Sequence, residues 1–393
     1  MPYYLITRFA ELIYLPILAV ICVVAGFAKK KINIGLGPEP LINNIYHKIA
    51  LEKHGYSAET FVNELYFITS RFDKKIIVEN RYKRWLLLQI LHIDFLFAIF
   101  RYECLYIYFN GGPLFTSYVL RGFEPWLLKL AQVKTVLMPY GGDVQELSRS
   151  PNLLFKHSYT QSYPEHKFRR SKISDTIDLW TKNADHIIGG CEWVDYMYHW
   201  DTLMVAHFSI DLSISESMQS KNDSTRSSLR VLHAPNHRAI KGTDHVVKAI
   251  DELKAKGLDI ELVLLEGLSN EQILKEITES DLVIDQLIIG WYAMFAIEAM
   301  TLCKPVICYQ RKDLLDLYRG VGLIEASEPP LINADVGNLA SVVERLYFNR
   351  TELDEYAERG RGYVERIHST LVVGKAFDSI NRRLGIHPDR DKI

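Results

Sequence analysis

Short β-rich runs alternate with helical runs along most of this 393-residue chain. This order is typical of an α/β fold with largely parallel sheets, because consecutive parallel strands need a crossover segment between them, usually a helix. The chain is too long for one ordinary core and predicts two domains with additional segments. Apolar residues make up 48% of it, with 22 tyrosines and 17 phenylalanines, as expected of a well-packed globular protein.

The charge balance and the cysteines exclude some classes of function. The formal net charge is -2, so the chain lacks the strong positive field that recruits nucleic acid, and we expect no nucleic-acid partner. The five cysteines are scattered, and their spacing fits neither a zinc site nor a redox motif. A reducing compartment is the simpler inference.

An apolar run over residues 12–28 is followed directly by Lys29-Lys30-Lys31. A run of this length is at the short end of what spans a bilayer, so residues 1–31 are predicted to be an N-terminal membrane-anchor helix. Three readings stay open: a spanning anchor, a helix lying in the plane of the membrane, and a cleaved signal or buried core helix. The lysines favour the inner (cytoplasmic) membrane, with the catalytic domains on the cytoplasmic side.

Residues 32–212 are predicted to form the first α/β domain. A strand over 32–36 ends at Gly37, in a strand–glycine–helix opening that could receive a ligand. Long helices are expected over 81–101 and 114–130.

The strand over 135–138 stops at Tyr140-Gly141-Gly142-Asp143. Two glycines at the turn offer Asp143 at the carboxyl end of a strand, which is the usual ligand edge of an open α/β sheet. We therefore predict Asp143 as an acceptor-side base or hydroxyl-orienting group. The alternative is an aspartate that caps the following helix.

A serine-rich stretch over 213–228 has almost no apolar content and is predicted to be a linker. A second α/β domain follows over 229–368. Its first strand leads into a loop with Asn236 and Arg238, and Lys241 and Thr243 stand where a helix opens. Two cations and free helical N–H groups at one point suit a diphosphate, although Thr243 could simply cap the helix.

Residues 281–309 predict a strand, a glycine turn, a helix and another strand. The first strand stops at Asp285 and Gln286, and Gly290-Trp291-Tyr292 opens the helix, so backbone N–H groups point toward any anion in front of them. Glu298 lies two turns into this apolar helix, where a charge is costly unless something binds it. The alternative is a helix whose polar edge carries one glutamate.

Four segments in the second half resemble the nucleotide-sugar-binding domain of GT-B glycosyltransferases, in particular family 4. They are IKGT at 240–243, LLEG at 264–267, DQLIIGWY at 285–292 and EAMTLCKPVICY at 298–309. The first half is similar more loosely, through GLGPEP at 35–40, PYGGD at 139–143 and DHIIGG at 185–190. The resemblance implies two facing Rossmann-like domains with a nucleotide-sugar in the cleft. It also implies a C-terminal helix over 369–393 that crosses back to the N-terminal domain.

The resemblance also assigns roles to residues. Arg238 and Lys241 match the cations that neutralise the leaving diphosphate, and Glu298 matches the second glutamate of the family's Glu-x7-Glu motif, which binds the ribose. The first glutamate of that motif falls on Gly290, so its function near the donor sugar is missing or is taken over by Asp285 or Gln286. The donor-binding candidates are Gly37, Asn236, Thr243, Glu266, Asp285, Gln286, Gly290, Trp291, Tyr292 and Glu298.

Together these features imply a membrane-associated glycosyltransferase. It would move a sugar from a nucleotide-diphosphate sugar to a glycan or lipid-linked acceptor, with retention, in cell-surface polysaccharide or glycolipid synthesis. Cations and helix N-termini can stabilise the diphosphate, so no metal or other cofactor is expected. Two alternatives remain open: a catalytically inactive nucleotide-sugar-binding homologue or partner subunit, which Gly290 favours, and a soluble epimerase or hydrolase of the same fold.

Overall fold

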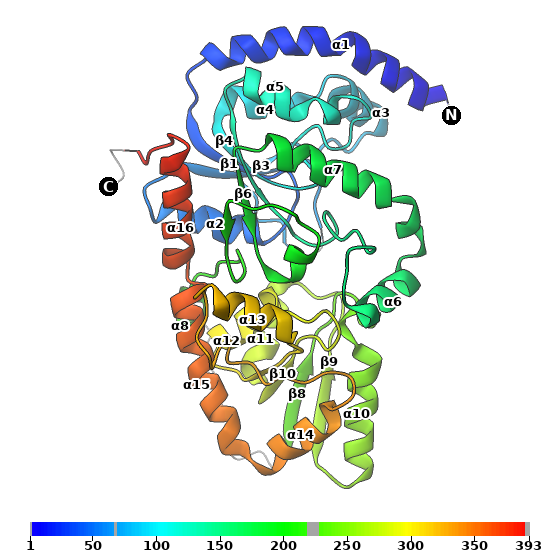
Figure 1. The fold of residues 1–393 in the computed structure, drawn as a ribbon, viewed down its shortest axis with the longest axis vertical. Coiled ribbons are helices and arrows are strands. Elements are labelled where there is room, and N and C mark those ends of the chain that lie inside the picture. Colours follow the sequence, from blue (N-terminus) through cyan, green and yellow to red (C-terminus); the bar gives the residue numbers. More distant parts are fainter. Residues whose placement is uncertain (1, 67–68, 218–227, 390–393) are drawn as a thin grey trace.

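A computed structural model describes residues 2–66, 69–217 and 228–389. In these ranges the chain forms two α/β domains, each built on a parallel sheet (Figure 1). The sheet of the N-terminal domain has seven described strands in the order β3-β2-β1-β4-β5-β6-β7. These strands are β1 (Ile32–Leu36), β2 (Ala58–Val62), β3 (Lys74–Lys75), β4 (Tyr102–Tyr108), β5 (Lys134–Met138), β6 (His186–Gly189) and β7 (Thr202–Leu203).

The centre of this sheet is β1, β4 and β5. β1 pairs with both β2 and β4, placing Ile34 opposite Ala58 on one side and Cys104 on the other. Almost every residue of these central strands is buried, as expected of a parallel sheet covered on both faces. The α/β class with parallel sheets is therefore confirmed.

Helices cover both faces of the N-terminal sheet. They are α2 (Asn43–Glu52), α3 (Arg81–Arg84), the π-helical η1 (Trp85–Ile90), α4 (Ile93–Arg101), η2 (Leu120–Gly122), α5 (Glu124–Leu130), α6 (Leu153–Ser162), η3 (Pro164–Phe168), α7 (Arg170–Asn183) and η4 (Cys191–Asp195).

Both long helices predicted in this domain are wrong in extent. The one over 81–101 breaks at His92, which has a left-handed φ of 48° next to the π-helical turn. The one over 114–130 starts only at η2 and α5. Before that, the buried Glu124 carboxylate accepts the N–H groups of Gly112 (3.1 Å) and Leu114 (2.8 Å), which stabilises a turn instead of a helix.

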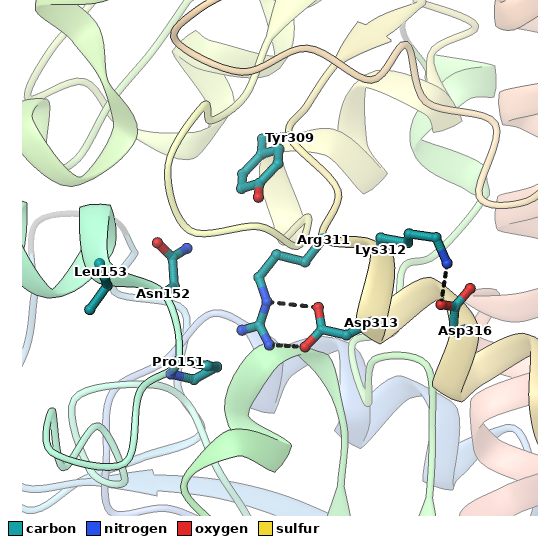
Figure 2. Close-up of a pocket in the computed structure, with 8 residues that line it drawn as sticks. All are labelled: Pro151, Asn152, Leu153, Tyr309, Arg311, Lys312, Asp313 and Asp316. Carbon is teal, nitrogen blue, oxygen red and sulfur yellow. Dashed lines mark hydrogen bonds and ion pairs between the residues drawn. The ribbon is translucent and has the colours of Figure 1, made fainter.

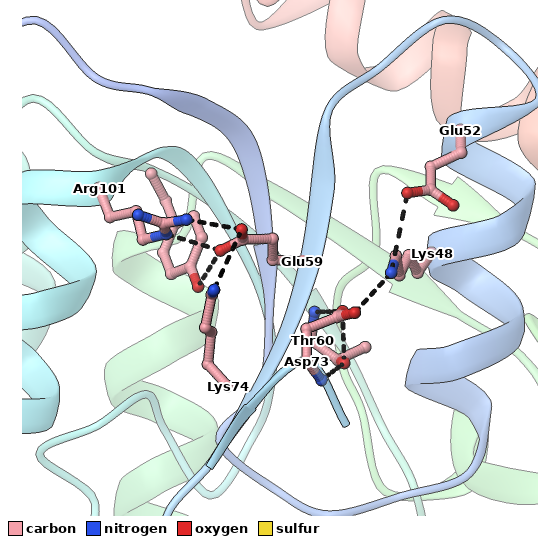
Figure 3. A network of polar contacts seen from close by, with 8 residues as sticks. Lys48, Glu52, Glu59, Thr60, Asp73, Lys74 and Arg101 are labelled. Atoms are coloured by element: carbon pink, nitrogen blue, oxygen red, sulfur yellow. Dashed lines mark hydrogen bonds and ion pairs between the residues drawn. The ribbon is translucent and has the colours of Figure 1, made fainter. Parts of the chain in front are cut away.

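Strand β2 was not predicted, and it and the segment before β3 carry the acidic residues Glu59 and Asp73. Figure 3 shows how they are satisfied: Arg101 donates twice to Glu59, at 2.6 Å each, in a bidentate pair. Asp73 accepts from both the backbone and the hydroxyl of Thr60 at 2.8 Å and pairs with Lys48 at 2.7 Å. This network ties the edge of the sheet to α2 and α4.

The sheet of the C-terminal domain has four described strands in the order β11-β10-β8-β9. They are β8 (Leu229–His233), β9 (Ile260–Leu264), β10 (Leu282–Ile284) and β11 (Val306–Ile307). The helices from the linker onward are α8 (Ser213–Ser217), α9 (Arg238–Lys241), α10 (Thr243–Ala255), α11 (Asn270–Glu279), α12 (Met294–Thr301), α13 (Lys312–Gly320), α14 (Leu339–Phe348) and α15 (Arg350–Ile367). Helix α8 begins within the serine-rich stretch, and residues 218–227 of that stretch lie outside the described residues.

The last described helix, α16 (Thr370–Arg383), returns to the N-terminal domain and packs on α2 (Figure 1). Asn381 accepts the hydroxyl of Tyr106 at 2.9 Å, and Asp378 accepts that of Tyr56 at 2.8 Å. Because α15 belongs to one domain and α16 to the other, the short segment between them is a second covalent link across the molecule.

Helix α1 (Pro2–Phe27) lies along the outer surface of the N-terminal domain, against α4 and α5 (Figure 1). Thr7, Glu11, Leu18, Cys22 and Ala25 form its buried stripe. The Glu11 carboxylate accepts the backbone N–H groups of Tyr118, at 3.0 Å, and Val119, at 2.5 Å. The outward face is apolar, and this helix is long and apolar enough to cross a membrane, a property that core helices and signal sequences share.

Candidate functional site

The carboxyl ends of the four C-terminal strands face the N-terminal domain and carry most of the predicted site residues. Lys241, at the end of α9, and Asp285, directly after β10, form an ion pair of 2.5 Å. The Asp285 side chain is fully buried, and its second oxygen accepts the N–H of Ala293 (3.4 Å), the residue before α12. The structure therefore brings the predicted Lys241, Asp285 and the start of α12 together.

Arg238 lies at the exposed rim of the same edge. Its guanidinium pairs with Glu266, which follows β9, at 2.8 Å and with Asp244 at 3.2 Å. Asn236, two residues earlier, is exposed. Both predicted cations are thus paired with carboxylates, and a diphosphate that bound here would replace those carboxylates as their partner.

Glu298 lies on α12 with only 4% of its surface exposed. Its carboxylate accepts a hydrogen bond from Asn270, at the start of α11, at 2.7 Å. Burial raises the pKa of Glu298 to about 7, the Asn270 hydrogen bond lowers it, and the charge of Asp285 raises it. Its second oxygen has no partner among the described residues, so the carboxyl group can still accept a ligand hydroxyl.

Gly290 is required by both its backbone and its surroundings. Its φ is +96°, a conformation that residues with a side chain rarely adopt. A Cβ at this position would lie 2.5 Å from Cγ of Arg311 and 2.6 Å from its Cδ. The stem of Arg311 therefore fills the space in which a glutamate at 290 would begin.

Arg311 joins the two domains. Its guanidinium contacts both carboxylate oxygens of Asp195, in η4 of the N-terminal domain, at 2.5 and 3.1 Å. It also binds Asp313 on its own domain at 2.5 Å (Figure 2). Close by, Tyr318 donates to the carbonyl of Cys191 at 2.7 Å. These hydrogen bonds tie the two domains together at this end of the cleft.

A pocket of about 590 Å³ opens beside Arg311 (Figure 2). Residues of both domains line it: Pro151, Asn152, Leu153, Tyr309, Arg311, Lys312, Asp313 and Asp316. Asn152 donates to the carbonyls of Ile288 (2.7 Å) and Ile289 (3.2 Å), which fixes the loop before Gly290. The lining is polar and aromatic, which suits a ligand with many hydroxyl groups.

Trp291 and Tyr292 can offer only their backbone N–H groups to a ligand. Both side chains are buried: Trp291 donates to the carbonyl of Val205 at 3.2 Å, and Tyr292 shares hydrogen bonds with Tyr363 and His368. Within the described ranges, the N–H groups of Trp291, Tyr292 and Met294 donate to no protein acceptor. They lie at the start of α12, where an anion is favoured.

Three of the predicted site residues, Asp143, Thr243 and Gly37, make structural contacts within their own domains. Asp143 accepts N–H bonds from Phe109 (3.0 Å), Tyr140 (3.0 Å) and Gly141 (2.9 Å), all of which precede it, so it stabilises the turn after β5 and does not cap a following helix; burial raises its pKa to about 7, and these bonds lower it. The hydroxyl of Thr243 is buried against His233 at 2.9 Å. Gly37 brings the chain so close to β2 that a Cβ would lie 2.0 Å from the Phe61 carbonyl oxygen.

Several buried polar atoms in the loops where the domains meet have no partner among the described residues. They include the Trp193 ring nitrogen, both ring nitrogens of His207, the Ser209 hydroxyl and the side-chain oxygen of Gln286. Such atoms are uncommon in the interior of a protein, and a polar ligand would satisfy them. No cluster of His, Cys, Asp or Glu in the described part of the chain is arranged to hold a metal ion.

No family model and no curated protein matches this sequence. Solved structures do match it in three dimensions. HepE of Anabaena, in complex with UDP and glucose, aligns over 90% of this chain and 100% of its own, with a TM-score of 0.58 and 11% identity. Sucrose-phosphate synthase of Thermosynechococcus elongatus aligns over 90% and 99%, with a TM-score of 0.57 and 13% identity. An α-glucosyltransferase in complex with UDP and DNA aligns over 89% and 99%, with a TM-score of 0.56 and 14% identity.

The chain has the GT-B fold. Both sheets and the cleft between them follow this architecture, as the sequence predicted. In the GT-B fold the edge that carries Lys241, Asp285 and Gly290 faces the N-terminal domain across the cleft.

The N-terminal side of the domain junction was not predicted from the sequence. Asp195 and Asn152 contact the second domain, yet neither stands in a recognisable motif. A weak signal was present for η4, where the glycines of DHIIGG are followed at once by two charged residues, Glu192 and Asp195. Polar residues directly after a parallel strand are candidates for the ligand edge.

Replacing Gly290 by alanine should lower the stability of the protein by more than the strain of a positive φ alone. We expect Gly290→Ala to lower the free energy of unfolding by about 2–4 kcal/mol, from the positive φ and the overlap with Arg311. Gly257→Ala is the matched control, because Gly257 has a φ of +91° with open space around it. Chemical denaturation of both variants measures the difference. Equal losses would show that Arg311 does not occupy this space.

Glu298 should make stability depend on pH. The pKa of Glu298 in the folded protein, about 7, lies above the value of 4.5 expected in the unfolded chain. The stabilisation of the folded state by protonated Glu298 is therefore complete below pH 4.5 and is lost as the pH rises through 7. Between pH 5 and 8, the unfolding free energy of the wild type should fall relative to Glu298→Gln by on the order of 2 kcal/mol. Denaturation at several pH values measures this, with the exposed Glu271→Gln as control. Parallel curves for wild type and Glu298→Gln would contradict it.

Proposed function

We propose that this protein is a membrane-associated glycosyltransferase that uses a nucleotide-diphosphate sugar. The observation that supports it best is the meeting of Lys241, the start of α12 and Glu298 at one edge of the cleft. Two of these elements suit a diphosphate, and a carboxyl group with a free oxygen suits a ribose. HepE is described with UDP and glucose, and with UDP-glucose, bound.

In this proposal the leaving group is the nucleoside diphosphate. The bond between the anomeric carbon and the β-phosphate oxygen breaks, and the acceptor oxygen forms a new bond to that carbon on the same face. The acceptor proton passes to the departing phosphate. Lys241 and Arg238 neutralise the growing charge on the phosphates, and the N–H groups of Trp291 and Tyr292 donate to it.

A glycan or lipid-linked acceptor fits the polar pocket beside Arg311. Gln286 supports the donor sugar, since its buried side-chain oxygen is unpartnered among the described residues. The competing function is a catalytically inactive homologue that binds the nucleotide-sugar as a partner subunit. Gly290 favours it, because no carboxylate fits at that position.

Donor turnover separates these two functions. We would incubate the detergent-solubilised protein with UDP-, GDP- and TDP-sugars and a membrane lipid extract and measure nucleotide release. Lys241→Ala should lower release at least a hundredfold, because the leaving charge loses its cation. Glu298→Ala should weaken donor binding about tenfold or more. Lys248→Ala, an exposed lysine on α10, is the matched control.

Donor binding without release would establish the inactive homologue instead. A Lys241→Ala variant that turns over like the wild type would remove the basis of the proposed site.

The membrane association is proposed to be in-plane. Helix α1 lies on the domain, fastened by Glu11, and presents an apolar outer face. Exposed cations flank it: Lys29 and Lys31 follow its end, and α3 contributes Arg81 and Lys83. An apolar stripe bordered by cations is typical of a helix at an anionic lipid surface, here the cytoplasmic face of the inner membrane.

Vesicle binding measures this association. Replacing Phe9, Ile13 and Ile17 together by serine should lower cosedimentation with phosphatidylglycerol-containing vesicles about tenfold or more, since three exposed apolar side chains are lost. The control replaces the exposed Leu153 and Phe348, which lie elsewhere, by serine. Wild-type protein that stays with cell membranes through alkaline carbonate extraction would contradict the in-plane arrangement and indicate a spanning helix.

A further inference from the structure

Glu192 lies in η4, directly after β6, where the N-terminal domain meets the second domain. The residue before it, Cys191, has a left-handed φ of 54°, which is uncommon for a residue with a side chain. The Cys191 N–H donates to Val205 at 3.1 Å, and its carbonyl accepts the Tyr318 hydroxyl. Such strain is found where the surrounding structure holds a neighbouring residue in place for a function.

Both ends of η4 are fastened to the C-terminal domain. Tyr318 binds at Cys191, and Arg311 binds at Asp195. Trp291 adds a third contact, since it donates to the same Val205 carbonyl that accepts from Cys191. Glu192 is therefore held at the closed part of the cleft, between two interdomain contacts.

Within the described ranges, no side chain from either domain donates a hydrogen bond to the carboxyl group of Glu192, which is 7% exposed; its one bond comes from its own backbone N–H. The other carboxylates at this interface are paired with cations, Asp195 with Arg311 and Asp285 with Lys241. A buried carboxyl group without a side-chain partner is costly and can accept further hydrogen bonds from a ligand.

The contacts of η4 place Glu192 beside the loop that carries Asp285 and Gly290. Asp195, at the end of η4, binds Arg311, and the stem of Arg311 lies against Gly290. The electrostatics agree with this position: burial raises the pKa of Glu192 to about 8, its own backbone N–H lowers it, Asp195 raises it, and Arg311 and Lys241 lower it. Glu192 therefore lies at the same domain junction as the candidate diphosphate site.

We propose that Glu192 contacts the transferred sugar and hydrogen-bonds its hydroxyl groups. This inference rests on the proposed function, because it requires a sugar joined to a diphosphate at Lys241. The sugar follows the β-phosphate, so it lies next to Lys241 and toward the N-terminal domain. The opposing loop presents no side chain at Gly290, whereas Glu192 offers a carboxyl group that can accept from a hydroxyl.

Comparing the affinities for the free nucleotide and for the nucleotide-sugar tests this contact. We would titrate wild type, Glu192→Gln and Glu192→Ala with UDP and with UDP-glucose, and with any other nucleotide and donor that the turnover panel selects. Glu192→Ala should bind the nucleotide-sugar about tenfold more weakly or worse and the free nucleotide within about twofold of wild type. The affinity of Glu192→Gln for the nucleotide-sugar should lie between those of wild type and Glu192→Ala, because the amide oxygen can still accept one hydrogen bond from a sugar hydroxyl.

Glu124→Gln is the matched control, since Glu124 is another buried glutamate of the same domain with its pKa raised to about 8 by burial. It should leave both affinities unchanged. Equal weakening of nucleotide and nucleotide-sugar by Glu192→Ala would mean that Glu192 only supports the interface, and unchanged sugar binding would mean that it makes no contact. Either result overturns this inference and leaves the proposed function standing. Wild-type protein that binds no nucleotide and no donor overturns both.

Discussion

The arrangement of the cleft depends on the ion pair between Arg311 and Asp195. The Arg311 side chain is only 8% exposed, and a buried guanidinium is tolerated when carboxylates surround it in good geometry. Asp195 from one domain and Asp313 from the other supply them. Because the stem of Arg311 passes where a side chain at 290 would begin, the pair also requires glycine there. This ion pair therefore links the position of η4 to the shape of the 285–293 loop, and the bonds from Tyr318 and Asn152 support the same junction.

The charges at the candidate diphosphate site are balanced within the protein. Lys241 pairs with Asp285, and Arg238 pairs with Glu266 and Asp244. In the proposed function, a diphosphate would exchange partners with these carboxylates, so the free energy that it gains would be smaller than two cations alone suggest. The carboxylates released from their cations would then be able to accept hydrogen bonds from sugar and ribose hydroxyls.

Helix α1 and the C-terminal domain lie on opposite sides of the N-terminal domain (Figure 1). Glu11 keeps α1 on the domain by accepting from three backbone N–H groups, so the outward face has a defined orientation. In the proposed in-plane arrangement, lipid would contact this face, and the C-terminal domain would lie away from the bilayer.

The sequence alone was sufficient for the fold class and for much of the donor edge. Continuous apolar runs predicted the strands β1, β5, β8 and β10, because a parallel strand is buried on both faces. Lys241, Asp285 and Glu298 each stand in a short local motif of the second domain, so the order of residues along the chain is enough to suggest them. The same reasoning failed for β2, whose Glu59 is paired with Arg101 from a distant segment.

Only the tertiary structure decided how the N-terminal domain completes the site. Asp195 and Asn152 are more than 90 residues from their partners in the second domain, and no local pattern records a contact across such a separation. The structure also showed that Asp143 is occupied by backbone N–H groups and that the side chain of Arg311 requires glycine at 290. Local residue patterns predict what one loop can bind, whereas the domain interface determines which side chains remain free to bind it.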